Sequence, residues 1–514
     1  MLDVRSAMRR AAGFNRERIA IVCGDRQFTY AQAWERGLRM ANALLALGTK
    51  PGDRIAVLED NCLEAADFFL GTAAANLVRV PLYKRNSKEA HGHMMRHTKC
   101  RVLVVSEEHM REVEGLKESL PDLKHVLVRG SDYESWLAKQ PATDPNPTVS
   151  MNDYYVIRHS GGTTGVSKGI GFTHREWMSM ERDWTHHLPP FSPSDFCIHA
   201  APISHGSGML FVPVWLAGGC NMLEPKFDAK RVLDLLATKG GYMFAVPTVV
   251  SDLVSTAKQM PTRPTFPKLK ALVVSGAPIR AQTALSARDL FGDKLYQMYG
   301  QTEAVPVAFM GPAEWFAEVP GSDPISSVGR VMPFAEIEIR GDDNKPLPTG
   351  EVGEIAVRCD GQMSSIWDDP ELTAQRLIDG WVLTRDVGRL DENGYLYLVD
   401  RKDDMIISGG FNIWPAELEI VIAAMRGVRE VAVVGIPDAR WGETPAAFVV
   451  LEPGVDMSAD AVIRECAERL GSYKKPSRVE FLSEPLPRTP VGKILRKALR
   501  EPFWKGHKSS ISGV

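Results

Sequence analysis

The side chains best suited to chemistry lie in one glycine-rich segment, Ser160-Gly161-Gly162-Thr163-Thr164-Gly165-Val166-Ser167-Lys168-Gly169, directly after an apolar run. Its three closely spaced glycines let the backbone curl and point N–H groups inward. Two threonine hydroxyls and the Lys168 ammonium add further donors, so the segment is suited to a polyphosphate. It is not a Walker A loop, because Gly169 follows the lysine where that motif needs Ser or Thr. A flexible surface loop is the competing interpretation.

Alternating strands and helices are expected to position this segment. The 514 residues favour about three domains. Short apolar runs predict buried strands at 102–106, 154–158, 197–200 and 271–275. Thr29 and Gln32 form a capping box that opens one intervening helix, and Asn61 with Glu64 repeats the signal before another. Residues 1 to about 325 should therefore form layered α/β sheets.

The pattern becomes β-rich after residue 325. Strands are predicted at 335–340, 353–358 and 381–384, and Asn393-Gly394 before an alternating run indicates a hairpin. Further strands, at 431–436 and 446–451, and a helix from Ser458 predict a small α+β unit. The expected fold class is α/β, with a large N-terminal domain over 1–402 and a mobile C-terminal domain over 403–514. The large domain includes a barrel-like subdomain at about 326–402.

Composition excludes several classes of protein. Lys and Arg number 61 and Asp and Glu 64, so the net charge of −3 gives no general attraction to nucleic acid. Seven scattered cysteines with no CxxC pair argue against a disulfide framework and favour reduced thiols in a cytoplasmic protein. The longest apolar stretch, 65–82, contains Asp67 and Arg79 and is predicted to be core, not a membrane span. His93 and His97 would share a helix face, but nothing nearby completes a convincing metal site.

Six further segments follow the glycine-rich one in a fixed order. They are Ser275-Gly276-Ala277-Pro278, Tyr299-Gly300-Gln301-Thr302-Glu303, Thr384-Arg385-Asp386, Asp400-Arg401-Lys402-Asp403, Ser408-Gly409-Gly410 and Pro487-Arg488-Thr489-Pro490-Val491-Gly492-Lys493. From about residue 15 to 500 the chain resembles the adenylate-forming superfamily, which includes acyl-CoA synthetases, luciferases and peptide-synthetase adenylation domains. Within it the chain looks most like the acyl-CoA ligase branch.

The resemblance implies an ATP site. Phosphate-binding residues would be Ser160, Gly161, Gly162, Thr163, Thr164, Gly165 and Lys168. Adenine would lie between Tyr299 and the segment Gly276, Ala277 and Pro278, with Gly300 and Gln301 beside it. Asp386 and Arg401 would meet the ribose hydroxyls. The catalytic residues would be Thr302 on the α-phosphate, Glu303 as the Mg²⁺ ligand, and Lys493 bridging the attacking carboxylate and the phosphate.

The resemblance also implies an acyl pocket and a coenzyme A channel. Residues 202–209 match an acyl gate, and the pocket walls would be His205, Gly208, Val246 and Ala304. His205 could equally cap the following helix. No Arg or Lys stands in this predicted lining, so we expect a hydrophobic fatty, aromatic or cyclic acid and disfavour a dicarboxylate. Ser408, Gly409 and Gly410 would line the channel, with Asp403 as the hinge.

The expected activity is that of an AMP-forming acid–thiol ligase, an ATP-dependent carboxylate–CoA ligase that passes through an acyl-adenylate and releases AMP and pyrophosphate. ATP, Mg²⁺ and coenzyme A are the expected cofactors and co-substrates. One alternative is a stand-alone adenylating enzyme that loads a carrier-protein thiol, and another is a non-catalytic ATP-binding regulator. The oligomeric state stays open, with a homodimer as one candidate. The family's usual glycine and proline are replaced by Arg385 and Ser167, which should retune ATP binding.

Overall fold

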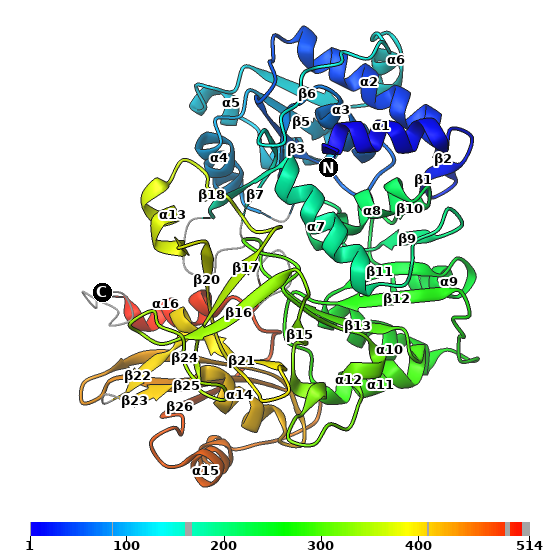
Figure 1. Ribbon diagram of the computed structural model, residues 1–514. Helices are drawn as coiled ribbons and strands as arrows, with labels where there is room; N and C mark the ends of the chain where they lie inside the picture. Colours follow the sequence, from blue (N-terminus) through cyan, green and yellow to red (C-terminus); the bar gives the residue numbers. More distant parts are fainter. Residues whose placement is uncertain (1, 85, 160–166, 409–410, 489–493, 506–514) are drawn as a thin grey trace.

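A computed structural model describes residues 2–84, 86–159, 167–408, 411–488 and 494–505, without the side chains of Asp403 and Asn412. The predicted residues 160–165, Gly409, Gly410 and Lys493 therefore lie outside the described residues, as does the side chain of the predicted hinge. Within this structure the chain forms four sheets and the helices that cover them (Figure 1).

The first sheet has seven strands and two covered faces. Its order is β18 (Ser365–Ile366), β8 (Gly169–Thr173), β7 (Tyr154–His159), β4 (Val78–Pro81), β3 (Arg54–Leu58), β5 (Val102–Ser106) and β6 (His125–Arg129). One face packs on α2 (Tyr30–Ala46), α3 (Ala65–Ala74) and α6 (Tyr133–Ala138). The other packs on α4 (Lys88–His97) and α5 (Leu116–Ser119). The short helix η1 (Glu107–Glu112) directly follows β5 and precedes α5. Strands β3 and β5 are apolar at most of their positions because both faces of the sheet are buried.

The second sheet has nine strands. Its order is β15 (Arg330–Val331), β14 (Ala308–Met310), β13 (Leu295–Tyr299), β12 (Leu269–Val274), β11 (Gly241–Ala245), β9 (Phe196–His199), β10 (Cys220–Leu223), β1 (Ile19–Cys23) and β2 (Arg26–Thr29). Its outer face packs on α9 (Ala229–Thr238), α10 (Pro247–Gln259), α11 (Ala281–Phe291) and α12 (Pro312–Trp315). The core between the two large sheets includes α1 (Val4–Phe14), α7 (His174–His187) and α8 (Phe211–Leu216), with η2 (Gly206–Leu210) leading into α8.

Two smaller sheets complete the fold. One contains β16 (Ala335–Arg340), β17 (Gly353–Cys359), β20 (Trp381–Leu390), β19 (Leu377–Ile378) and β21 (Leu396–Arg401), with α13 (Pro370–Arg376) and η3 (Pro324–Ser326) nearby in sequence. The other contains β22 (Ile406–Ser408), β23 (Phe411–Ile413), β24 (Val428–Asp438), β25 (Gly442–Leu451) and β26 (Arg478–Phe481). Around it lie η4 (Lys402–Asp404), α14 (Pro415–Ala423), α15 (Ala459–Leu470) and α16 (Arg496–Trp504). Figure 1 shows this last unit below the large sheets.

The predicted α/β class is confirmed, and each predicted strand is present. The Thr29 capping box also forms, with both of its hydrogen bonds to Gln32. The second capping signal is wrong, because Asn61 does not cap α3. The strand predicted at 381–384 extends to Leu390 before the Asn393-Gly394 turn. The proposed boundary at residue 402 stays a prediction, although every strand of the last sheet follows it.

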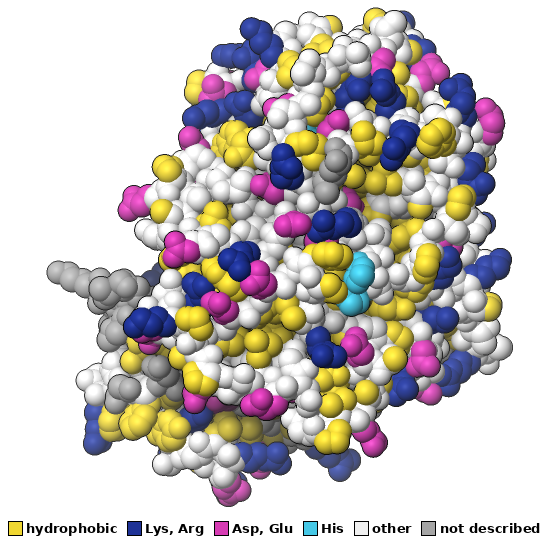
Figure 2. Space-filling model, viewed as in Figure 1, with side chains coloured by type: hydrophobic (Ala, Val, Ile, Leu, Met, Phe, Trp, Pro, Cys, Tyr) yellow, Lys and Arg dark blue, Asp and Glu magenta, His cyan; other side chains and the backbone are white. Residues whose placement is uncertain are grey.

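Both signs of charge are interspersed over the face drawn in Figure 2. All seven cysteines are free thiols. Among the described residues, no helix has the length and apolarity needed to cross a membrane, and no His, Cys, Asp and Glu cluster is arranged to hold a metal ion.

Candidate active site

Two of the predicted segments follow the carboxyl ends of neighbouring strands in the nine-stranded sheet. Strands β12 and β13 are parallel neighbours, and their carboxyl ends lead into residues 275–278 and 300–303. In open α/β sheets ligands bind beyond the carboxyl ends of the strands. The strand order thus explains why the two segments, far enough apart in sequence to be separated by α11, contribute to a single site.

The centre of this site is the carboxylate of Asp386, which comes from β20 of a different sheet. Its Oδ2 accepts a hydrogen bond from the Tyr299 hydroxyl at 2.8 Å and another from the Gln301 amide. Its Oδ1 lies 2.9 Å from Nε of Arg401. Burial and the adjacent carboxylate raise the pKa of Tyr299 well above 10, so the phenol stays a donor. Four predicted nucleotide residues are therefore in direct contact.

The backbone that presents Asp386 is held in an unusual conformation. Arg385 has a φ of +63°, in the left-handed region where a glycine is favoured. The Arg385 N–H donates to Oε1 of Glu354 at 3.0 Å, and Oε2 of Glu354 lies 3.1 Å from Nζ of Lys402. Thr384 Oγ1 donates to the carbonyl of Ile355 at 2.7 Å. Glu354 is thus a positioning residue that the sequence-based interpretation missed. An acidic residue inside an apolar strand was its only signal.

Glu303 is suited to a hard cation. Its side chain is mostly buried, and Nη2 of Arg376 lies 3.9 Å from its Oε1, beyond hydrogen-bond distance. A carboxylate whose oxygens are not committed to a close partner fits the oxygen coordination that Mg²⁺ prefers. The carbonyl of Glu303 accepts from the Met363 N–H at 2.7 Å, which fixes the backbone of this segment.

Small residues shape the adenine side of the site. A Cβ added to Gly300 would lie 2.7 Å from Cγ2 of Val305 and 3.0 Å from the carbonyl oxygen of Ala304, so the backbone has no room for a side chain. Gly276 has a φ of +88°, which permits the turn at the end of β12. Its added Cβ would lie 3.3 Å from Cγ1 of Val246, so the predicted pocket wall does touch the predicted adenine segment.

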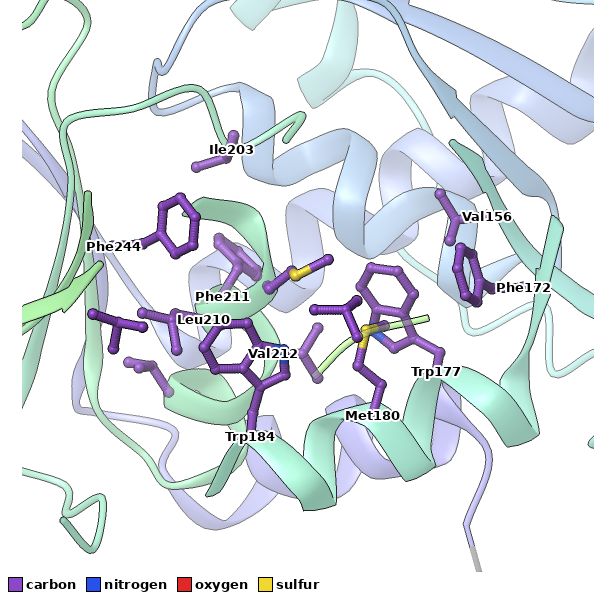
Figure 3. Close-up of a cluster of buried hydrophobic side chains, with 14 of the residues drawn as sticks. Val156, Phe172, Trp177, Met180, Trp184, Ile203, Leu210, Phe211, Val212 and Phe244 are labelled. Carbon is purple, nitrogen blue, oxygen red and sulfur yellow. The ribbon is translucent and has the colours of Figure 1, made fainter. Parts of the chain in front are cut away.

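The predicted acyl gate packs tightly against the apolar core. A Cβ on Gly208 would lie 1.9 Å from the carbonyl oxygen of Ile203, and one on Gly206 would lie 2.7 Å from the Phe244 ring. Figure 3 shows Ile203 and Phe244 above Leu210 and Phe211, at one end of the cluster that continues to Trp177 on α7.

His205 occupies the N-cap position of η2, but its side chain makes no capping hydrogen bond there. Its ring meets the ring of Tyr83 edge-on at 4.6 Å, and its Nδ1 lies 3.0 Å from Oγ of Ser204. Burial and the nearby Arg158 lower the pKa of His205 to about 3, so the ring is neutral. A neutral histidine at the gate is compatible with the predicted place beside an acyl group.

Two buried polar contacts position the gate segment from behind. The Asn61 carboxamide donates to the carbonyls of His199 and Ala201 at 2.8 and 2.9 Å and accepts from the Ile203 N–H at 2.9 Å. Nε2 of His199 lies 2.8 Å from Oδ1 of Asn221, and its Nδ1 lies 2.9 Å from Oγ of Ser207. Burial lowers the pKa of His199 to about 4, in agreement with a neutral ring that donates once and accepts once.

The C-terminal unit meets this site through the segment after β21. The carboxylate of Asp400 accepts from the Ala416 N–H at 2.8 Å, at the beginning of α14, and burial raises its pKa to about 7. Ser408, the described part of the predicted channel, pairs with Gly442 in the last sheet. Beyond it the rings of Phe411 and Tyr473 lie 5.1 Å apart, and both side chains are at least half exposed.

Comparisons with known proteins agree with this geometry. A family model described as AMP-binding enzyme matches residues 8–367, and one described as AMP-binding enzyme C-terminal domain matches residues 417–493. A fatty acid–[acyl-carrier-protein] ligase, ScoC of Streptomyces coeruleorubidus, is 31% identical over 94% of this chain and 93% of that protein. A feruloyl-CoA synthase of Amycolatopsis sp is 33% identical over 94% and 96%. The crystal structure of ATP-bound MatB from Rhodopseudomonas palustris has a TM-score of 0.87 at 28% identity, covering 99% of this chain and all of that one.

Proposed function

The chain belongs to the AMP-binding enzyme family, and we propose that within it the protein is an ATP-dependent carboxylate–CoA ligase. The single observation that carries the proposal is the Asp386 cluster, in which a carboxylate, a guanidinium and a phenol meet beside the carboxyl ends of β12 and β13. The substrate is a fatty, aromatic or cyclic acid with an apolar body, because the gate segment packs on the apolar core.

The first half-reaction joins the acid to the nucleotide. A carboxylate oxygen of the acid attacks the α-phosphorus of ATP, the new O–P bond forms, and the bond to pyrophosphate breaks. Negative charge grows on the phosphoryl oxygens, so donors and cations must already surround them. Thr302 would donate to the α-phosphate, Lys168 and residues 160–165 would hold the outer phosphates, and Lys493 would add a further positive charge. Mg²⁺ held by Glu303 would neutralise phosphate charge.

The second half-reaction transfers the acyl group to a thiol. The sulfur attacks the acyl carbon, the bond to AMP breaks, and the thiol proton leaves to solvent. We propose coenzyme A as the acceptor, which the similarity to a feruloyl-CoA synthase supports. The exposed rings of Phe411 and Tyr473, near the channel segment that begins at Ser408, offer stacking surfaces for a nucleotide. The similarity to ScoC keeps a carrier-protein thiol as the second candidate.

Product analysis tests the proposal. The purified protein is incubated with ATP, Mg²⁺ and a panel of fatty, cinnamic-type, benzoic-type and polycyclic acids, with and without coenzyme A. We expect pyrophosphate release with at least one acid and a coenzyme A thioester detected by mass spectrometry. Thioester on a carrier protein but not on coenzyme A would favour the second candidate. No pyrophosphate with any acid would favour a regulatory ATP-binding protein.

A matched pair of lysine variants tests the assigned catalytic residue. Lys493→Ala should abolish acyl-adenylate formation while ATP still binds, because the charge that bridges carboxylate and phosphate is lost. Lys497→Ala, which removes an exposed lysine of α16, should leave the rate unchanged. Equal adenylate formation by the two variants would overturn the role of Lys493.

The free thiols of all seven cysteines support the proposed cytoplasmic location.

A further inference from the structure

Arg376, at the end of α13, carries a guanidinium that faces the proposed magnesium ligand. Its Nη2 lies 3.9 Å from Oε1 of Glu303, and the two side chains are only 12% and 11% exposed. Its Nε donates to the carbonyl of Leu383 at 2.8 Å, which fixes the position of the guanidinium. Leu383 directly precedes the segment Thr384-Arg385-Asp386. Arg376 therefore contacts two parts of the proposed ATP site, although none of the predicted motifs includes it.

The segment that leads to Arg376 is hydrogen-bonded to two other parts of this site. The Met363 N–H donates to the carbonyl of Glu303 at 2.7 Å. The Trp367 N–H donates at 2.8 Å to the carbonyl of Gly169, the last residue of the glycine-rich segment. Between these two residues lies β18, which pairs with β8. The backbone before α13 is thus fixed relative to both the metal ligand and the end of the phosphate-binding segment.

Most of the donors of this guanidinium are unused. Arginine has five N–H groups, and among the described residues only the Nε–H of Arg376 has an acceptor, because 3.9 Å is beyond hydrogen-bond distance. Its Nη atoms are not among the unpartnered polar atoms that the fold seals from solvent, so a ligand can reach them. A guanidinium with a fixed position and free, accessible N–H groups is suited to an oxyanion such as phosphate.

The balance of charge indicates which oxyanion these donors would bind. The guanidinium of Arg376 and the carboxylate of Glu303 carry opposite charges and lie close together. When Glu303 holds Mg²⁺, two cations share one carboxylate, and the surplus positive charge favours an anion that contacts both of them. A polyphosphate is such an anion. A metal ion and an arginine on the same phosphate chain are a general means of stabilising the charge that develops in phosphoryl transfer.

We propose that Arg376 is a further phosphate-binding residue, whose Nη groups donate to the triphosphate of ATP. This inference rests on the proposed ligase function, because it gives Arg376 a part in the first half-reaction. When the bond between the α-phosphorus and pyrophosphate breaks, the electron pair goes to the bridging oxygen, and negative charge grows on the leaving group. Arg376 offsets this charge as a donor. It gives up no proton and remains a guanidinium throughout.

Equilibrium binding tests the inference without any turnover. Isothermal titration calorimetry gives Kd for ATP, inorganic pyrophosphate and adenosine, with Mg²⁺ and with the metal removed by a chelator. Arg376→Met removes the donors, so Kd for ATP and for pyrophosphate should rise by about tenfold or more, as expected for a lost charge-assisted hydrogen bond. Adenosine has no phosphate, so its Kd should stay within about twofold. Arg376→Lys should retain part of the phosphate affinity, because it keeps the charge.

The metal-free measurement separates phosphate binding from a role through Glu303. If Arg376 only positioned Glu303, Arg376→Met would weaken ATP binding in the presence of Mg²⁺ alone, whereas a direct contact with phosphate predicts a loss in both conditions. Arg39→Met is the matched control, because Arg39 on α2 is a partly buried arginine whose Nη2 lies 2.7 Å from Oε1 of Glu35. It should leave all three Kd values unchanged.

The outcomes distinguish this inference from the ligase function. An unchanged metal-free Kd for ATP in Arg376→Met, or equal losses for ATP and adenosine, would overturn the inference even if the wild-type protein forms a thioester. Weaker binding of ATP and pyrophosphate by Arg376→Met would support it even if no acid yields pyrophosphate, which is the result that refutes the ligase function. A wild-type protein that binds neither ATP nor pyrophosphate would overturn both.

Discussion

Asp386→Asn removes the charge at the centre of the proposed ribose site while keeping the size of the side chain. In the structure the carboxylate accepts from Tyr299, Gln301 and Arg401. The Asn side chain has one accepting oxygen and one NH₂ group in place of the two carboxylate oxygens. The NH₂ group would face a hydrogen-bond donor, so at least one of these hydrogen bonds is lost. A hydrogen bond to a charged group contributes about 1.5–3 kcal/mol. Losing one such bond to ribose should therefore raise KM for ATP by roughly tenfold to a hundredfold.

The assay is pyrophosphate exchange at saturating acid, with the ATP concentration varied. We expect kcat to change little, since ribose is held equally in the ground and transition states and uniform binding appears in KM. Adenosine compounds without the ribose hydroxyls provide the control, because the variant and the wild-type enzyme should bind them equally. A variant with unchanged KM for ATP would refute the assignment of Asp386 to ribose. If the variant has an unchanged KM for ATP but a lower melting temperature, Asp386 serves only to connect the two sheets.

Four further substitutions test the structure elsewhere. Gly208→Ala should destabilise the protein by roughly 3 kcal/mol or more, because the added Cβ would lie 1.9 Å from the carbonyl oxygen of Ile203. Gly13→Ala in α1, where nothing lies within 4 Å, should instead stabilise it in the same denaturant titration. Arg385→Gly should raise stability by roughly 0.5–1 kcal/mol, because glycine relieves a φ of +63°. Burial lowers the pKa of His199 to about 4 in the folded protein. As the pH falls, the unfolded chain, in which this pKa is 6.5, therefore takes up the proton before the folded protein does. Its contribution to stability therefore falls by about 1.4 kcal/mol per pH unit as the pH drops from 6.5 to 4, and a His199→Gln variant should lose that slope.

Local patterns were sufficient for the parts of the fold that local physics decides. The capping box at Thr29 and the hairpin at Asn393-Gly394 each depend on a few adjacent residues, and both form. The superfamily and the class of AMP-forming acid–thiol ligase are confirmed by two family models and by the similar ligases. These motifs were recognisable because each requires a particular residue type at a particular backbone position.

Contacts between distant strands were not predictable in this way. Asn61 carries a capping signature, but three buried backbone groups of residues 199–203 compete for its carboxamide, and tertiary context prevails. Arg79 lies in a segment that was predicted to be apolar core, and no local pattern indicated that its strand would pair with the strand that carries Arg158. Glu354 was part of a predicted strand, and its role toward Arg385 follows only from the pairing of β17 with β20. The individual roles of the site residues remain predictions.

The Asp386 cluster constrains how ribose can bind. A carboxylate offers about four lone-pair positions. Protein donors already occupy three of them, two on Oδ2 from Tyr299 and Gln301 and one on Oδ1 from Arg401. Both ribose hydroxyls therefore cannot donate to Asp386 unless a protein donor withdraws. Arg401 is the donor best able to withdraw, because its side chain is 34% exposed whereas Tyr299 is buried. A guanidinium released from Oδ1 could donate to a ribose oxygen in turn, so nucleotide binding would exchange one ion pair for several hydrogen bonds at the segment leading into the C-terminal unit.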